Sequence, residues 1–179
     1  VNTEEEALTG AMDIIAEIIS DNAEYRDIIR RVAYERGVIQ TEGSKEEKSV
    51  YEKYYDYKEP VKSVPNHRVL AINRGEKEKF LKVNLILPEE YILSKLKSII
   101  ITNRQAGSRD YLEMSIEDSY KRLIFPSIER EVRSNLTERA EEEAIKVFAL
   151  NLKPLLMQPP IKGKVVMGID PGFRTGCKV

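Results

Sequence analysis

The residues from Ser127 to Lys153 contain no glycine and no proline and are rich in glutamate, arginine, alanine and leucine. These residue types favour helices, so the stretch predicts one uninterrupted helix, about 40 Å long at roughly 1.5 Å per residue. Pro126 lies at its start, where a proline is tolerated, and Pro154 predicts its end or a kink. A helix of this length constrains the rest of the chain, because other elements must pack along it.

An apolar residue recurs at every fourth position of this helix: Ile128, Val132, Leu136, Ala140, Ala144, Phe148 and Leu152. A step of four residues exceeds one helical turn by about 40°, so this apolar row winds around the helix. Different parts of the helix are therefore expected to contact different partners, with Phe148 buried like the rest of the row. The alternative interpretation is an ordinary amphipathic helix in a bundle.

The remaining pattern predicts a mainly α fold, a helical scaffold with one long central helix and a small two-stranded β element. Helices are expected from a Thr3 capping box to about residue 20, from residues 21–22 to Gly37, from Asn66 to Gly75, from Pro88 onward, and through residues 111–123. Apolar and polar residues alternate from Leu81 to Leu87, which predicts a half-buried strand. The stretch from Val38 to Thr41 is its expected partner.

The composition changes near residue 158 and predicts a boundary between two parts. Residues 1–157 form the helical region, and residues 158–163, which include two prolines, are expected to be a linker. Within residues 164–179, an apolar run up to Asp170 predicts a strand, Pro171 and Gly172 predict a turn, and a second strand begins at Gly176. Two strands alone are marginally stable, so we expect residues 164–179 to start a domain that continues beyond the chain.

Several classes of protein are excluded by composition. One cysteine, Cys177, and one histidine, His67, leave no basis for an internal disulfide framework or a zinc site built from this chain. The sequence has no apolar run of about 18 residues, which excludes a transmembrane helix, and its acidic first residues do not resemble a signal peptide. A cytoplasmic protein without a cofactor is expected.

Basic residues gather in the middle of the chain. Residues 59–105 hold nine basic and five acidic side chains, although the net charge of the whole chain is −1. The basic set is Lys77, Lys79, Lys82, Lys95, Lys97 and Arg104, with Phe80 among them. Lys77, Lys79 and Lys82 are the candidate nucleic-acid-binding residues, and a solvated helix or strand face is the alternative.

Four tyrosines lie close together at residues 51, 54, 55 and 57, with a spacing that suits a helix. Packing of the rings with the hydroxyl groups near water is the favoured interpretation. A platform on which nucleic-acid bases stack would use the same residue type, and it is the alternative.

The sequence Gly-Ile-Asp-Pro-Gly, residues 168–172, resembles the opening of RNase H-like folds of the Holliday-junction-resolvase type. In such folds the aspartate, here Asp170, is one of several carboxylates that hold two Mg²⁺ ions for phosphodiester cleavage. One carboxylate holds Mg²⁺ poorly, so no metal site is expected in this chain. Arg174 follows the turn and is a candidate phosphate contact, with a solvated turn residue as the alternative.

Three stretches together resemble the Tex family of bacterial transcription accessory proteins: YEKYYDYKEPVKSVPNHRVLAINRGEKE at 51–78, the long helix with its tail to Pro160, and VVMGIDPGFRTGCKV at 165–179. The resemblance implies a helical N-terminal scaffold that leads into an RNase H-like domain, followed by helix-hairpin-helix units and an RNA-binding barrel. It also implies nucleic acid, RNA or DNA, as a partner, and a role with the transcription machinery.

The resemblance further implies that the chain is a scaffold segment and not an enzyme, with Asp170 retained at the motif position without catalysis. Two alternatives stay open at this point. The chain could belong to a metal-dependent RNase H-like nuclease led by Asp170, or it could be a helical protein-interaction module.

Overall fold

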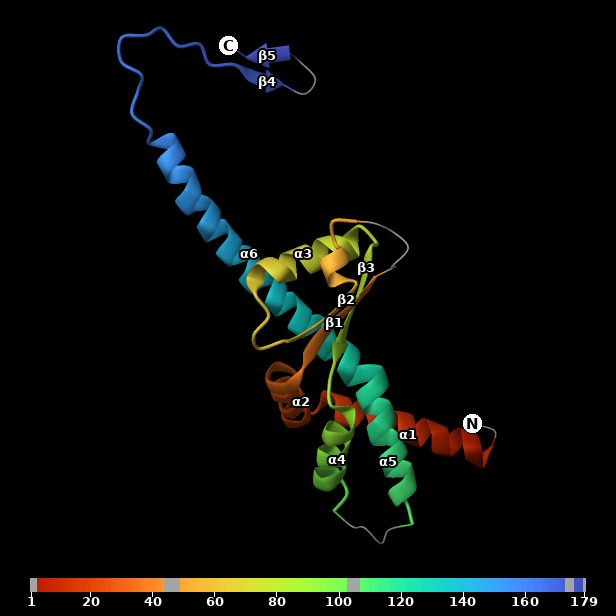
Figure 1. Cartoon of the computed structure of the whole chain (residues 1–179). Coiled ribbons are helices and arrows are strands. Elements are labelled where there is room, and N and C mark those ends of the chain that lie inside the picture. Colours follow the sequence, from red (N-terminus) through yellow and green to blue (C-terminus); the bar gives the residue numbers. More distant parts are fainter. Residues whose placement is uncertain (1–2, 44–48, 103–106, 173–175, 179) are drawn as a thin grey trace. The chain divides into compact units, whose positions relative to one another are not determined.

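The computed structural model describes residues 3–43, 49–102, 107–172 and 176–178. The chain divides into two compact units, residues 1–144 and residues 145–179, and the division falls within the long helix α6. Figure 1 shows the elements along the chain, and each unit is described by itself below.

The predicted helices of the first unit are present: α1 (Glu4–Asp21), α2 (Ala23–Arg36), α3 (Asn66–Lys77), α4 (Glu89–Ile100) and α5 (Arg109–Asp118). The expected cap of α1 is confirmed, because the Thr3 hydroxyl accepts a hydrogen bond from the Glu6 N–H at 3.2 Å. Asn22 caps α2 through its side-chain oxygen, which accepts from the backbone N–H groups of Glu24 and Tyr25. Local side-chain chemistry thus determines where these helices begin.

The sheet of the first unit has three antiparallel strands in the order β2-β1-β3: β1 (Val38–Gly43), β2 (Asp56–Pro60) and β3 (Leu81–Ile86). The predicted pairing of β1 with β3 is confirmed, with Val38 opposite Ile86. The predicted two-stranded element lacked one strand, because β2 also pairs with β1, along its other edge. The mainly α class is nevertheless correct.

Strand β2 contains the end of the tyrosine cluster, which a helical spacing did not predict. Residues Glu52–Tyr54 form a single 3₁₀ turn, η1, and the chain then enters β2. Tyr51 and Tyr55 are buried, and the rings of Tyr54 and Tyr57 meet edge to face with centroids 5.4 Å apart. The packing interpretation of this cluster therefore agrees with the structure.

Helix α6 (Phe125–Leu156) is not separate from α5 as predicted, because residues 109–156 form one continuous helical run. A π-helical segment, η2 (Ser119–Ile124), joins them, and the Phe125 N–H donates to the Tyr120 carbonyl five residues earlier. Pro126 has no N–H and would clash with the carbonyl four residues before it in a regular α-helix. The wider π turn removes that conflict, which explains why the proline does not start a new helix.

The first half of the apolar row forms the centre of the core. Ile128, Val132 and Ala140 are fully buried and Leu136 is 4% exposed, and they pack with side chains of the sheet and of the other helices. The second half of the row differs from the prediction, because Phe148 is 65% exposed. The core supplied by the other elements ends at Ala140, so nothing buries the row in the second unit as the structure describes it.

The second unit contains the end of α6, a stretch without regular structure, and a hairpin of β4 (Asp170–Gly172) and β5 (Gly176–Lys178). Pro154 lies inside α6, which continues to Leu156 instead of ending at the proline. The strand expected before Asp170 is absent, and Val165 is fully exposed. A buried apolar strand needs neighbouring strands and cover on its faces, and the described part of the chain supplies neither to residues 164–169.

A search for membrane-spanning segments found no helix, among the described residues, with both the length and the apolar character that a bilayer crossing requires.

Candidate nucleic-acid interface

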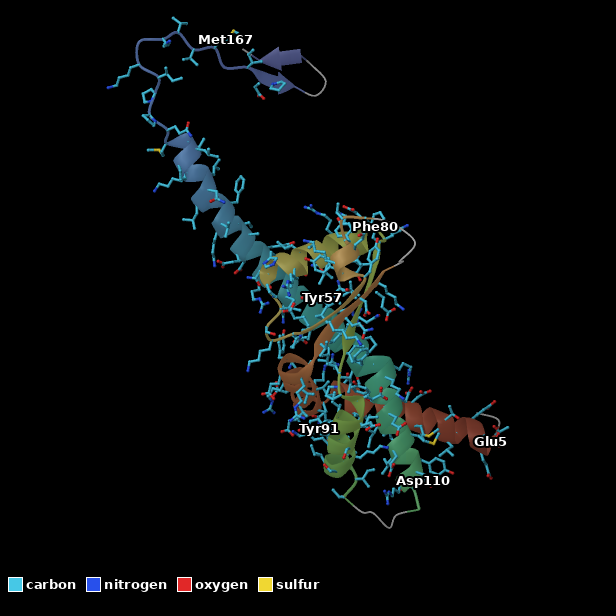
Figure 2. All side chains as sticks on the ribbon, in the orientation of Figure 1. Glu5, Tyr57, Phe80, Tyr91, Asp110 and Met167 are labelled. Carbon is cyan, nitrogen blue, oxygen red and sulfur yellow. The ribbon has the colours of Figure 1, made fainter. Side chains whose placement is uncertain are left out.

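The candidate basic residues meet at the connection between α3 and β3, here called the α3–β3 corner (residues 74–82). Lys77 is the last residue of α3, Lys79 lies in the turn and Lys82 lies on β3, and all three are exposed. Phe80 belongs to the same corner (Figure 2). The structure thus brings together the three lysines that the sequence singled out.

A helix-terminating turn of the Schellman type shapes the corner. The Phe80 N–H donates to the Gly75 carbonyl at 2.9 Å, and the Lys79 N–H donates to the Glu76 carbonyl at 3.0 Å. Lys79 accordingly adopts a left-handed backbone conformation with φ of 65°. The turn holds the lysine backbone positions in place while their side chains project into solvent.

An aromatic cluster packs against the α3–β3 corner on its buried side. Tyr51, Tyr55 and Leu81 are buried together, and the Phe80 ring lies 5.8 Å from the Tyr51 ring. A side chain at Gly75 would come within 2.6 Å of the Leu81 side chain, so the glycine permits this close packing. Burial, together with a hydrogen bond to the Glu78 carboxylate, raises the pKa of the Tyr51 phenol. The buried rings stabilise the corner and do not form an open platform for bases.

Acidic groups reduce the positive charge at the corner. Glu42 of β1 lies opposite Lys82 in the sheet register, and Glu78 lies between Lys77 and Lys79 in the sequence. Arg74 is exposed three residues before Lys77 and adds a cation that the sequence reasoning did not include. Its spacing of three residues from Lys77 on a predicted helix could have identified it. The corner therefore carries a modest excess of positive charge.

The other predicted basic residues lie elsewhere. Lys97 is on α4, where its ammonium group binds the carboxylates of Glu113 at 3.1 Å and Glu117 at 2.7 Å. The hydrogen bond to Glu117 is the largest cause of the raised pKa of Lys97. Lys95 is also on α4 and is exposed, and Arg104 lies outside the described residues. A role for Lys77, Lys79 and Lys82 in binding nucleic acid stays a prediction.

The RNase H-like motif residues belong to the second unit. Asp170 is exposed in β4, opposite Lys178 in the hairpin register. In the part of the chain that the structure describes, no group of three or more acidic, histidine or cysteine side chains could hold a metal ion. Arg174, the other candidate in this region, lies outside the described residues.

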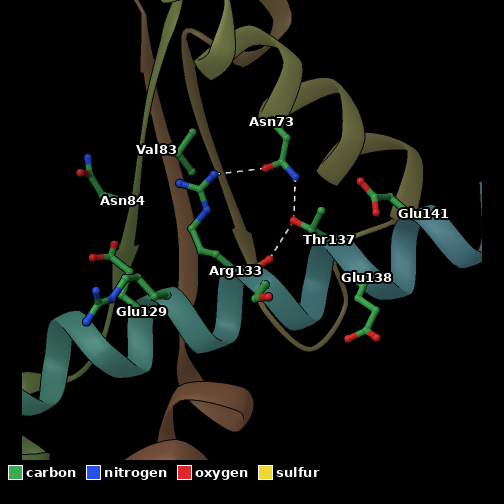
Figure 3. A pocket seen from close by; sticks show the side chains of 10 residues that line it. Asn73, Val83, Asn84, Glu129, Arg133, Thr137, Glu138 and Glu141 are labelled. Atoms are coloured by element: carbon green, nitrogen blue, oxygen red, sulfur yellow. Dashed lines mark hydrogen bonds between the residues drawn. The ribbon is translucent and has the colours of Figure 1, made fainter.

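A groove of about 760 Å³ lies beside the corner, between α3, β3 and the first half of α6 (Figure 3). The Arg133 guanidinium reaches from α6 to α3, where it donates to Glu76 at 2.8 Å and to Asn73 at 3.2 Å. Asn73 in turn donates to the Thr137 hydroxyl at 2.8 Å. These contacts connect α3, which ends at the corner, to the first half of α6 within the first unit.

Strand β3 is also tied to α6, through a carboxylate. Glu129 accepts a hydrogen bond from the Leu85 N–H at 2.9 Å. Glu129, Arg133, Thr137 and Glu141 follow one another at intervals of four residues, next to the buried apolar row, and all four line the groove. The sequence reasoning missed the groove, although this second row with its four-residue spacing was a readable signal for it.

Comparison with known proteins assigns the chain to a family. A family model described as Tex central region-like matches residues 1–148. This chain belongs to the Tex family. The match includes the α3–β3 corner and the groove, and it confirms the resemblance that three stretches of the sequence suggested.

Individual relatives agree with this assignment to the Tex family. The Bacillus subtilis protein YdcI is 53% identical over all of this chain, which covers 26% of that protein. The transcriptional accessory protein Tex of Neisseria gonorrhoeae is 33% identical over 96% of the chain and 24% of that protein. Human S1 RNA-binding domain-containing protein 1 is 34% identical over 95% of the chain and 19% of that protein. The Tex chain described here thus spans about a quarter or less of these relatives.

Proposed function

We propose that this chain is the helical scaffold segment of a cytoplasmic transcription accessory protein that binds nucleic acid. The observation that carries the proposal is the combination of the Tex family match with the construction of α6. One half of α6 is locked into the core of the first unit, and the other half exposes apolar side chains such as Phe148 and Leu155. The names of two relatives, which mention transcription and an S1 RNA-binding domain, support the nucleic-acid role.

In this proposal α6 acts as a rigid strut that holds an RNase H-like module and RNA-binding modules at a defined angle. The angle can be changed without touching a core residue, by inserting alanines between Glu143 and Ala144 in the full-length protein. Two inserted residues rotate everything that follows by about 200°, whereas four rotate it by about 40°. We expect the two-residue insertion to reduce RNA affinity of the full-length protein much more than the four-residue insertion. Equal affinity for both variants and the wild type would show that α6 is a simple tether.

The chain itself is proposed to contribute little affinity for nucleic acid. The charge at the α3–β3 corner is modest, so we expect a Kd no tighter than about 10⁻⁵ M at physiological salt, the range of non-specific association. Fluorescence anisotropy with labelled single-stranded RNA, single-stranded DNA and duplex DNA measures this directly. Reversal of Lys77, Lys79 and Lys82 to Glu tests the corner, and Lys95→Glu on α4 shows the effect of one charge reversal outside it. Nanomolar binding that the triple variant abolishes would make the corner a primary binding site.

We also propose that the chain has no nuclease activity of its own. Asp170 is a single exposed carboxylate, and two-metal cleavage requires several carboxylates around the ions. The chain is incubated with Mg²⁺ or Mn²⁺ and labelled junctions, duplexes and single strands. Cleavage that disappears in Asp170→Asn would support the nuclease alternative instead.

A further inference from the structure

The outer edge of β3 carries backbone groups that no strand of the described sheet uses. The Val61 N–H donates to the Gly37 carbonyl at 2.9 Å, and the Gly43 N–H donates to the Tyr55 carbonyl at 3.0 Å. The backbone N–H and C=O groups of odd-numbered β1 residues therefore point toward β2, and those of even-numbered residues point toward β3. In the observed register, residues 82, 84 and 86 of β3 direct their backbone N–H and C=O groups toward β1. The backbone groups of residues 81, 83 and 85 therefore point away from the sheet, at its outer edge.

The outward direction is verified by Leu85, whose N–H reaches the Glu129 carboxylate of α6 at 2.9 Å. Within the described residues, the neighbouring outward N–H, that of Val83, has no hydrogen-bond partner. An unpaired edge of this kind is a template for another strand. Glu129 covers part of this edge with a side chain, which a strand can displace.

Two recesses follow this edge, one on each side of Glu129. The first is the groove of about 760 Å³, which Val83 and Asn84 line from the strand and Glu138 and Glu141 line from α6. Both glutamates are exposed. Of the two arginines that line this groove, Arg133 is paired with Glu76, and Arg130 donates to the Pro126 carbonyl at 3.1 Å. The first recess therefore favours a cationic side chain.

The second recess has a volume of about 390 Å³ and a different character. It is lined by Leu85, Ile86, Leu87, Glu89, Tyr120, Lys121 and Phe125. The two charged members form a salt bridge with each other at 3.0 Å, so the remaining surface is largely apolar. This recess favours a large apolar side chain.

We propose that the outer edge of β3 binds an extended peptide of a partner protein as an additional antiparallel strand. Val83 supplies the central pair of backbone hydrogen bonds. An apolar residue of the peptide enters the recess at Tyr120, and a Lys or Arg four residues later reaches Glu138 and Glu141. Four residues span about 13 Å of a strand and place both side chains on the same face. This binding mode is strand addition with side-chain pockets for specificity.

The test uses the whole 179-residue chain and a fluorescein-labelled peptide, Thr-Phe-Thr-Val-Thr-Lys-Thr. We expect saturable binding with a Kd on the order of 10⁻⁵ to 10⁻⁴ M, as for a short peptide with few anchors. Hydrogen exchange at the Val83 amide should slow when the peptide binds. The same peptide with proline in place of its central valine loses a backbone donor, so its binding should fall at least about tenfold.

Charge reversal on α6 tests the cationic recess. Glu141→Lys should weaken binding by about fivefold or more, and a peptide with Glu in place of Lys should recover most of that loss. Glu142→Lys is the matched control, because Glu142 is exposed on the same helix and does not line the groove. It should change the affinity less than about twofold. Equal effects of the two reversals would contradict the proposed position of the peptide.

Removal of the Glu129 carboxylate should strengthen peptide binding, whereas the Glu141 charge reversal should weaken it. Glu129→Ala frees the Leu85 N–H, so binding should tighten by roughly threefold or more, even if the variant is somewhat less stable. The absence of saturable binding up to about 1 mM would overturn the proposal. Protection of the Val83 amide that rises with protein concentration without peptide would also overturn it, because a second copy of the chain would then be the occupant.

Discussion

Lys79 is the one non-glycine residue with a positive φ in the described part of the chain. Its left-handed conformation is required by the turn that ends α3, at the position where glycine is usually found. A lysine there has a steric cost that glycine does not have. Lys79 is also one of the three candidate contacts for nucleic acid, so stability and binding can be separated at this residue.

We expect Lys79→Gly to raise the free energy of unfolding by about 0.5–1 kcal/mol, because glycine adopts the left-handed conformation without strain. Urea denaturation measures the change. Lys77→Gly is the comparison, since Lys77 has helical backbone geometry and should lose about 0.5–1 kcal/mol instead. A loss of stability in Lys79→Gly would show that its side chain, and not its backbone, matters to the fold.

Tyr120 gives a prediction for alkaline pH. Burial in the π-helical segment, with a smaller contribution from Glu89, raises the pKa of Tyr120 to about 12. The phenol has a pKa of about 10 when the chain is unfolded, so the unfolded state releases its proton first as the pH rises. The stabilisation is complete below about pH 10 and is lost between about pH 10 and 12.

At about pH 11.5 this difference amounts to roughly 2 kcal/mol of unfolding free energy. The comparison is between the wild type and Tyr120→Phe, which keeps the ring that lies 5.9 Å from Phe125 and removes the hydroxyl. The wild type should lose about 2 kcal/mol more than the variant between about pH 9 and 11.5. Parallel curves for the two proteins would mean that the Tyr120 hydroxyl is not buried.

At the scale of the element, α6 is one helix with two environments. Its helical backbone and its apolar row continue to the end of the helix, but the core packs only against the part up to Ala140. The π-helical segment before it keeps α5 and α6 in one helical run in spite of Pro126. Helix propensity therefore determines the extent of α6, whereas burial against the other elements determines how much each part of it contributes to stability.

Two substitutions in the same apolar row measure that difference. Leu136→Ala should lower the unfolding free energy by about 2–5 kcal/mol, because the side chain is buried and its removal leaves a cavity. Phe148→Ala should change it by less than about 1 kcal/mol, because the side chain is exposed. Thermal and urea denaturation of both variants give the comparison. A loss of several kcal/mol in Phe148→Ala would show that this part of α6 is covered in solution.

At the scale of the whole molecule, the first unit has a hydrophobic core and the second has none among its described residues. Its apolar side chains at Val165, Val166, Met167 and Ile169 are exposed. The amide groups of residues 165–169 should therefore exchange with solvent far faster than those of residues 128–140, whose helix is packed in the core. Hydrogen exchange followed by mass spectrometry measures both regions together. Strong protection of residues 165–169 at every protein concentration would contradict the absence of a folded unit there.

The candidate sites differ in how far the sequence could predict them. Lys77, Lys79 and Lys82 could be predicted to share a surface, because they are close in the sequence and lie around one turn. The groove and the open edge of β3 could not be predicted in the same way, because they combine α3, β3 and α6, which are far apart in the chain. Even so, the row of Glu129, Arg133, Thr137 and Glu141 was visible beside the apolar row.

The sequence by itself determined the features that depend on neighbouring residues: the Thr3 cap, the start of the second helix at residues 21–22, the alternation in β3, the long helix and the Tex resemblance. Only the tertiary structure decided the features that depend on distant residues. Strand β2 exists because β1 offers it a partner, Pro126 is accommodated because a π turn widens the helix, and the apolar row is buried only as far as other elements reach it. Local propensity and capping act over a few residues, whereas pairing and burial depend on which segments the folded chain brings together.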